Sequence, residues 1–279
     1  MSSGCWGCGM PEPMTEAEYH AHPALSYSVG KLLLRSPQHY LHRLANREEL
    51  PEFDTGHAIH CLVLGVGADL VEIPHDSYRT KEARELRDQA YAAGKTPIKT
   101  ADMAPIWAAA EAVLAHPTAR AWLEKPGDVE VPLFATDPET GIDIRGKLDK
   151  LATHGTRRVP VDLKTVTDAR EAKVYAAVRD YDYDLQAAMY RLLIRLALGV
   201  EPGPGVLIAV EKAAPYGVAC YQLAHEDVIA AGDLKLRTVL ARAEALRDNP
   251  DDWQGYPLGT HVLTPPPYYL TDLEERLAS

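Results

Sequence analysis

Residues 128–166 read DVEVPLFATDPETGIDIRGKLDKLATHGTRRVPVDLKTV, and this stretch decides the fold. It predicts three consecutive strands, at 129–135, 142–151 and 159–166, because β-branched and apolar residues gather there between turn signals. The turns are DPETG at 137–141 and HGTR at 154–157, where Pro and Gly suit the backbone angles of a turn. We therefore expect three neighbouring strands at the centre of the molecule.

Charged residues lie inside these otherwise apolar strands: Glu130, Asp149, Asp162 and Lys164. A buried carboxylate is costly unless it is paired or holds a metal. Asp162 and Lys164 are two residues apart, so on a strand their side chains share one face. If Asp149 lies on the neighbouring strand, two carboxylates and a lysine meet, and oxygen ligands of this kind suit Mg²⁺ or Mn²⁺. The pattern predicts metal-assisted phosphodiester hydrolysis.

These residues also carry a resemblance. Gly146-Lys147-Leu148-Asp149, followed by Asp162-Leu163-Lys164, resembles the PD-(D/E)xK nuclease signature. Further pieces are similar to the RecB-like and exonuclease VIII-like branch of that superfamily: GHAIH at 56–60, QAAMY at 186–190, and the opening ALSYS at 24–28 with LLLRSP at 32–37. D-x-K alone is a weak signal, whereas five elements in the right order, spread over residues 15–270, are a strong one.

The resemblance implies an α/β fold with a central mixed sheet of about five strands flanked by helices, a restriction-endonuclease-like core. We expect residues 1–23 to be a flexible leader and 24–279 to be one nuclease domain. Its parts would be a helical portion at 24–127, a catalytic core at 128–249 and a tail at 250–279. Helices are expected at 26–35, 37–45, 56–64, 81–93, 100–115, 117–123, 169–179, 185–198 and 226–247, and further strands at 69–73, 206–210 and 217–223.

The resemblance also implies an activity. The branch hydrolyses linear duplex DNA from its ends with Mg²⁺ or Mn²⁺, 5′ to 3′, and supplies single strands for recombination or repair, often in phages. Its members tend to form rings, so a homo-oligomer and a single-strand annealing protein are expected as partners beside DNA. Two alternatives stay open. The chain could be a single-strand-acting or endonucleolytic relative, or a catalytically silent DNA-binding or assembly protein of the same fold.

Site residues follow from the matched motifs. Asp149 and Asp162 are expected to bind metal, joined by His60, Glu130 and the Leu163 carbonyl. Lys164 would stabilise or deprotonate the attacking water. Gln186 and Tyr190 are four residues apart on one helix face, and they would contact the water or phosphate and the scissile strand. Arg191 and Lys212 are candidate DNA contacts. Without the motif, His60 would be interpreted as a core histidine and Glu130 as a solvent-facing strand residue.

Composition sets outer limits. The 279 residues are 46% hydrophobic, ample for a core, and the net charge of −11 argues against nonspecific duplex binding over the whole surface. No run of about 18 apolar residues indicates a membrane span, and a cytoplasmic location is expected. Cys5 and Cys8 form a C-x-x-C pair, which would suit a metal only with a second pair close by.

Overall fold

The computed structural model describes residues 14–46, 54–67, 69–249, 255–265 and 267–278. In chain order, the elements before the central strands are α1 (Glu16–Ala21), β1 (Leu25–Ser26), α2 (Tyr27–Gly30), α3 (Leu32–Arg35), α4 (Pro37–Ala45), α5 (Asp54–Leu64), β2 (Leu70–Ile73), α6 (Lys81–Ala92), β3 (Thr96–Lys99), α7 (Thr100–Ala115) and α8 (Pro117–Leu123). The rest are β4 (Gly127–Thr136), β5 (Asp143–His154), β6 (Arg157–Val166), α9 (Glu171–Asp180), α10 (Tyr183–Leu198), β7 (Val206–Glu211), β8 (Val218–Gln222), α11 (Glu226–Asp248) and α12 (Tyr269–Ala278).

The main sheet is mixed, with strand order β1-β5-β6-β7-β8 and β4 on the other edge of β5. Strand β5 runs antiparallel to β4 and to β6, as the two predicted turns require, and parallel to the short β1. Strand β7 runs parallel to β6, since α9 and α10 form the crossover between them, and β8 returns antiparallel as a hairpin. The predicted mixed sheet with flanking helices is therefore confirmed, with six strands where about five were expected.

One edge of β5 is shared by two strands that do not meet. Strand β6 pairs with β5 only over residues 150–154, and β1 pairs with it only at residues 144 and 145. Residues 146–149 of β5 therefore lie in a gap between β1 and β6. This gap contains the Gly146-Lys147-Leu148-Asp149 motif.

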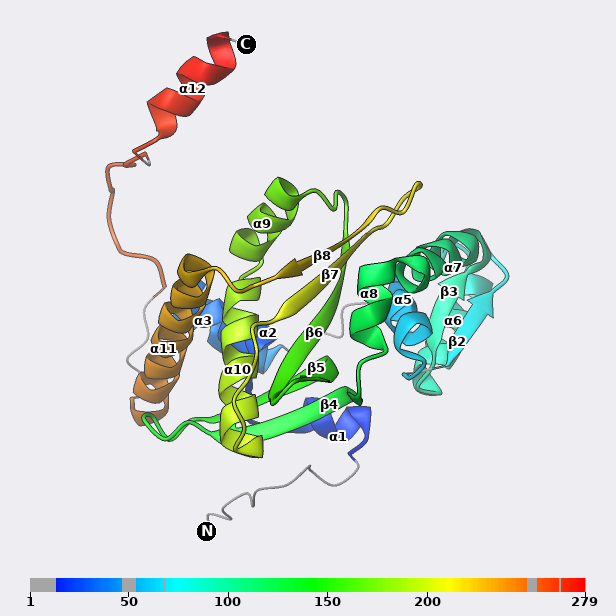
Figure 1. Cartoon of the computed structure of the whole chain (residues 1–279), viewed down its shortest axis with the longest axis horizontal. Helices are drawn as coiled ribbons and strands as arrows, with labels where there is room; N and C mark the ends of the chain where they lie inside the picture. The colour runs from blue at the N-terminus through cyan, green and yellow to red at the C-terminus, as the bar shows by residue number, and fades with distance from the viewer. Residues whose placement is uncertain (1–13, 47–53, 68, 250–254, 266, 279) are drawn as a thin grey trace.

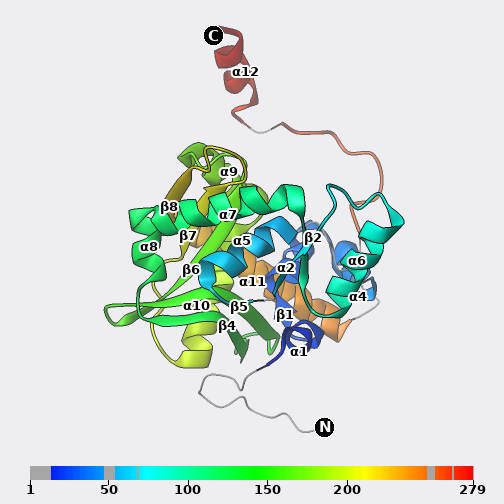
Figure 2. The same ribbon diagram turned by 90° about the vertical axis from the view of Figure 1, so that its right-hand side faces the viewer.

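Helices cover the two faces of the sheet. Helices α10 and α11 lie side by side on one face, and α5, α7 and α8 lie on the other (Figure 1 and Figure 2). Each face has its own buried cluster: one joins β4 and β5 to α10 and α11, and the other joins β6 and β7 to α5 and α7. None of the helices that the structure describes has both the length and the apolar character needed to cross a bilayer.

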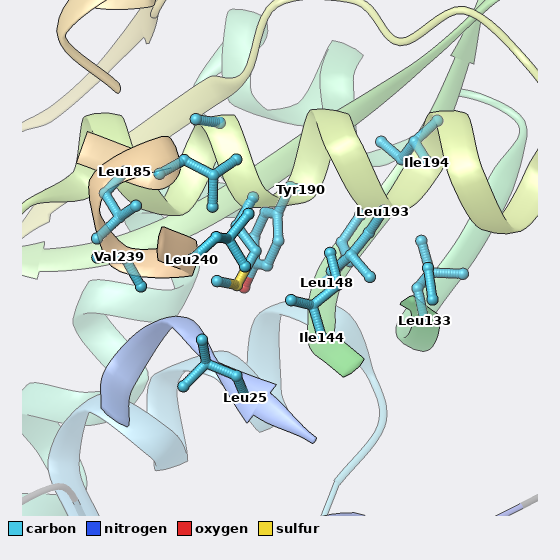
Figure 3. Packing of buried hydrophobic residues seen from close by; sticks show 14 of the residues in the cluster. Leu25, Leu133, Ile144, Leu148, Leu185, Tyr190, Leu193, Ile194, Val239 and Leu240 are labelled. Carbon is cyan, nitrogen blue, oxygen red and sulfur yellow. The ribbon is translucent and has the colours of Figure 1, made fainter. Parts of the chain in front are cut away.

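The first cluster fixes α10 against the sheet. Leu185, Leu193 and Ile194 from α10 pack with Ile144 and Leu148 from β5, and each of these side chains is fully buried (Figure 3). Burying a side chain of this size contributes about 1.5–3 kcal/mol. The register of α10 on the sheet is thus strongly specified, which matters because α10 also carries Gln186 and Tyr190.

The N-terminal half differs from expectation in two places. Within residues 24–127, β3 was not expected; it pairs in parallel with β2, which lies in the expected strand at 69–73, and α6 is their crossover. Residues 14–23 are not flexible leader: Thr15 caps α1, and Tyr19 is 8% exposed against Phe134 of β4. The remainder of the expected leader, including Cys5 and Cys8, lies outside the described residues.

The tail leaves the body of the protein beyond α11. Tyr256 accepts a hydrogen bond from Nε of Arg35 (2.9 Å) and lies against the His39 ring. Beyond it, residues 257–265 are exposed, and α12 stands clear of the sheet and its helices (Figure 1). Over residues 255–265 and 267–278, the tail therefore does not cover the sheet.

Candidate functional site

The site is built where β5 loses its regular alternation. Leu148 and Leu151 are three residues apart, yet both pack in the cluster under α10. In a regular strand they would point to opposite faces of the sheet, so the alternation of side chains between the two faces is interrupted once between them. Glu130, on the neighbouring strand β4, has a φ of 52°, a left-handed angle that is rare for residues other than glycine. Asp149 lies at this interruption, at the end of the gap between β1 and β6.

Asp149 connects β5 to β6 and to α5. Its Oδ2 accepts a hydrogen bond from the backbone N–H of Leu163 (2.8 Å) and lies 3.4 Å from Nδ1 of His60. Burial raises the pKa of Asp149, His60 and Lys164 oppose the rise, and Asp162 adds to it, so that the net pKa is about 6. His60 therefore contacts Asp149 as predicted, and Asp162 lies close enough to raise the pKa of Asp149.

Asp162 and Lys164 share a face of β6, as their spacing predicts. Nζ of Lys164 lies 2.6 Å from Oδ2 of Asp162, and the two side chains are 19% and 13% exposed. Burial lowers the pKa of Lys164, but Asp162 and Asp149 raise it by more, so the net pKa lies above its usual value. Lys164 is therefore an ammonium group held against a carboxylate.

Gln186 and Tyr190 form a hydrogen-bonded chain across the gap. Nε2 of Gln186 donates to Oδ1 of Asp162 (3.2 Å) and to the hydroxyl of Tyr190 (2.9 Å), and that hydroxyl donates to the carbonyl of Lys147 (2.9 Å). Tyr190 thus bonds the backbone where β5 lacks a neighbouring strand. Tyr190 is only 7% exposed and its ring lies among core side chains (Figure 3), so the ring offers no open face for the contact with the scissile strand that was expected. The pair positions Asp162 and the backbone of β5.

The expected metal-ligand set is only partly assembled. Glu130 forms an ion pair with Lys147, so each carboxylate at the site has a basic neighbour: Lys147 for Glu130, His60 for Asp149 and Lys164 for Asp162. Among the described residues, no three His, Cys, Asp or Glu side chains are grouped in a way that would hold a metal ion. The donor types still fit Mg²⁺ or Mn²⁺, because the carboxylates of Asp149 and Asp162 supply the oxygen atoms that these ions prefer. Such an ion would have to displace ammonium groups from the carboxylate oxygens.

Two predicted DNA contacts have different settings. Arg191 is 12% exposed and pairs with Asp233 of α11 (2.7 Å), so it ties two helices together rather than facing the site, and we do not retain it. Lys212 is exposed at the start of the β7–β8 loop, which projects beyond the sheet (Figure 1).

The structure also brings in residues that sequence reasoning missed. Nζ of Lys164 lies over the Tyr183 ring, 4.8 Å from its centre, and Tyr183 lies beside Tyr181. The hydroxyl of Tyr27, from α2, donates to the carbonyl of Tyr181. Tyr27 lies within the ALSYS opening, and the Y-D-Y-D run at 181–184 precedes Gln186. The ALSYS opening and the Y-D-Y-D run can both be seen in the sequence, but only the fold shows that they lie in contact.

Comparison with known proteins agrees with this geometry. A family model described as a PDDEXK-like domain of unknown function matches residues 26–252. A solved structure from Eubacterium rectale, named "Putative exonuclease", superimposes with a TM-score of 0.61 over 94% of this chain and 98% of that chain, at 13% identity. At that identity the likeness shows the fold alone.

A second structure, SSO0001, gives a TM-score of 0.32 over 71% of this chain and 84% of that chain, also at 13% identity, and carries no argument. No curated protein matches the sequence. The matched model spans most of the chain and includes the D-x-K strand, the gap in β5 and the Gln186 helix. The expected membership of the PD-(D/E)xK superfamily is confirmed, and the chain belongs to the family of PDDEXK-like domains.

Proposed function

We propose that this protein is a divalent-metal-dependent nuclease that hydrolyses phosphodiester bonds of linear duplex DNA from an end, 5′ to 3′. One observation carries the proposal: Asp149 and Asp162 approach each other at the gap in the sheet, with Lys164 held 2.6 Å from Asp162. Two carboxylates and a lysine at a break between strands match what metal-assisted phosphate chemistry needs.

Asp149 and Asp162 would hold the metal, with His60, the Leu163 carbonyl and Glu130 as further donors. When bound, Mg²⁺ or Mn²⁺ supplies Lewis-acid stabilisation of charge on the phosphate and lowers the pKa of a bound water. The Lys164–Asp162 contact supports this assignment, because a carboxylate oxygen that holds an ammonium group can also hold a metal cation.

The protein's own groups do the remaining work. Lys164, as an ammonium group, donates hydrogen bonds to phosphate oxygens as negative charge grows on them. Gln186 fixes Oδ1 of Asp162, and Tyr190 fixes the β5 backbone beside Asp149. Both are positioning residues that keep the carboxylates within reach of one phosphate.

End-directed action and partners are the finer part of the proposal. The similar structure from Eubacterium rectale carries an exonuclease name, and the motif order is similar to that of exonuclease VIII-like proteins. The net charge of −11 for the single chain opposes binding to DNA. An assembly of several copies around DNA would offset this charge locally, because it would gather exposed lysines such as Lys212 on the surface that faces the DNA. A single-strand annealing protein is the partner that would use the product.

The experiment is a cleavage assay on linear duplex DNA labelled at either 5′ or 3′ ends, with Mg²⁺, Mn²⁺ or chelator, and with a closed circle of the same sequence. Early release of the 5′ label from linear DNA alone is the expected result. Cutting of the circle would make the protein an endonuclease. Cutting only of heat-denatured DNA would make it a single-strand nuclease, and no cutting with either metal would indicate a DNA-binding or assembly protein.

A further inference from the structure

A row of aromatic rings leads from the catalytic lysine to solvent. Tyr183 lies under Lys164, with Nζ 4.8 Å from the ring centre, and is itself half-buried. Tyr181 follows, with its ring centre 5.8 Å from that of Tyr183 and the ring planes inclined by 32°. Tyr181 is 57% exposed. The row therefore starts inside the site and ends at an open ring.

The backbone that presents Tyr181 is held in place from two sides. Tyr27 of α2 donates its hydroxyl hydrogen to the carbonyl of Tyr181. The next residue, Asp182, has a left-handed φ of 61°, and its carboxylate accepts a hydrogen bond from Nζ of Lys235 on α11 (2.8 Å). These contacts hold the backbone from which the Tyr181 ring projects beside Tyr183.

The chemistry of the row suits one kind of ligand. An aromatic face with a cation behind it stacks well on a nucleobase, and each such contact contributes substantially to binding of single strands because every base has a π-face. Inside a duplex both faces of a base are covered by its neighbours, so the ring can reach a base only where it has left the stack. A phosphate at Lys164 would place the base of an adjoining nucleotide near this row.

We propose that Tyr181, backed by Tyr183, is the stacking platform for an unpaired base next to the phosphate that is cut. This inference rests on the proposed nuclease function and narrows its substrate class to ends with at least one unpaired nucleotide. Tyr181 contacts the substrate base, whereas Tyr183 and Tyr27 position it. The platform selects by stacking and has no preference among the four bases.

The first test measures binding without cleavage. A duplex with one unpaired 5′-terminal nucleotide carries 2-aminopurine at that position and is titrated with protein in chelator. Stacking on Tyr181 quenches the fluorescence in the wild type and in Tyr181→Phe, and the quench is absent in Tyr181→Ala. Tyr175→Ala is the matched control, since Tyr175 is a similarly exposed tyrosine (59%) on α9. Equal quenching in Tyr181→Ala and wild type overturns the proposal.

The second test uses cleavage. Replacing the unpaired terminal nucleotide by an abasic one should lower kcat/KM of the wild type by about tenfold, the order expected for one base–aromatic stack. Tyr181→Ala should cleave both ends at the slower rate, and Tyr181→Phe should behave as the wild type. Wild-type protein that cleaves base-bearing and abasic ends equally contradicts the proposal.

The two failures can be told apart. A protein that cuts DNA but ignores the terminal base keeps the proposed function and loses the platform. A protein that shows the Tyr181-dependent quench without cutting keeps the platform and loses the nuclease activity. Light scattering on Tyr181→Ala covers the remaining case: a fall in mass would assign the exposed ring to a contact between copies and overturn the platform.

Discussion

The backbone N–H of Leu163 donates a 2.8 Å hydrogen bond to Oδ2 of Asp149, joining two strands through a side chain where their backbone pairing has stopped. Leu163 lies between Asp162 and Lys164 in the sequence. The bond therefore fixes the position of Asp149 on β5 relative to these two side chains on β6. It also gives the partly buried Asp149 carboxylate a hydrogen-bond donor at the gap in β5.

Asp149 should make the metal-free protein less stable as the pH rises. Its folded-state pKa of about 6 lies above the ordinary 3.8, so the folded protein binds the extra proton between those values. The free energy of unfolding therefore falls as the pH rises from about 4 through 6, by about 3 kcal/mol. Asp149→Asn should lose this dependence and be the more stable protein at pH 8. Urea titrations in chelator at pH 5 and pH 8 measure both, and parallel pH dependence in the two proteins would contradict the expectation.

Asp162→Asn should have the opposite effect on stability. Removing this carboxylate leaves the Lys164 ammonium without its 2.6 Å partner in a largely buried place, although Asp149 remains nearby. We expect a loss of about 1–3 kcal/mol. Calorimetry with Mn²⁺ should show binding to the wild type and none to this variant. Undiminished Mn²⁺ binding would remove Asp162 from the ligand set.

Tyr190→Phe tests the hydrogen-bonded chain across the gap. It leaves the Lys147 carbonyl and the Gln186 amide each short of one buried partner, at a cost of about 1–3 kcal/mol. Because Gln186 positions Asp162, more Mg²⁺ should be needed for half-maximal cleavage, by several fold. Tyr175→Phe, an exposed tyrosine on α9, is the control. A Tyr190→Phe protein with normal stability and metal requirement would show that the chain is incidental.

Gly146→Ala tests why the motif begins with glycine. A Cβ there would lie 2.8 Å from Cδ1 of Leu193 and 2.9 Å from Cε1 of Tyr190, closer than packed carbons allow. Overpacking of this kind costs about 1–3 kcal/mol, and displacing Tyr190 should also slow cleavage. The cost should be smaller in a Leu193→Ala background, which a double-mutant cycle of unfolding free energies measures. Strict additivity would show that Leu193 is not what the new methyl group meets.

Strands β4 to β8 of the sheet and the D-x-K face could be predicted because they depend on local signals, whereas the two-residue β1 was not expected. Turn residues at 137–141 and 154–157 set the hairpins, and a spacing of two places Asp162 beside Lys164. Strand β2 was expected at 69–73, but its partner β3 was missed because Thr96–Lys99 is short and contains a proline, which weakens a strand signal. Arg191 was misplaced because helix periodicity gives its neighbours on α10 but not Asp233 on α11.

The roles of Gln186 and Tyr190 could not be predicted for a related reason. Their shared helix face follows from spacing, but their partners, Asp162 and the Lys147 carbonyl, depend on the gap in β5. That gap arises from how far β6 and β1 each pair along one edge, which is a tertiary property. The aromatic row from Tyr183 to Tyr181 likewise exists only once α10 is packed on the sheet.

The central claim is that Lys164, beside Asp162 and Asp149, carries out phosphodiester hydrolysis. The most direct measurement is the cleavage rate of linear duplex DNA by Lys164→Ala with saturating Mg²⁺, next to the wild type and to Lys173→Ala, an exposed lysine on α9. Circular dichroism and Mn²⁺ calorimetry on the same samples establish that folding and metal binding are retained. We predict a rate at least about a hundredfold below wild type for Lys164→Ala and an unchanged rate for Lys173→Ala. A Lys164→Ala protein that cuts within about twofold of the wild-type rate would contradict the assignment of the site.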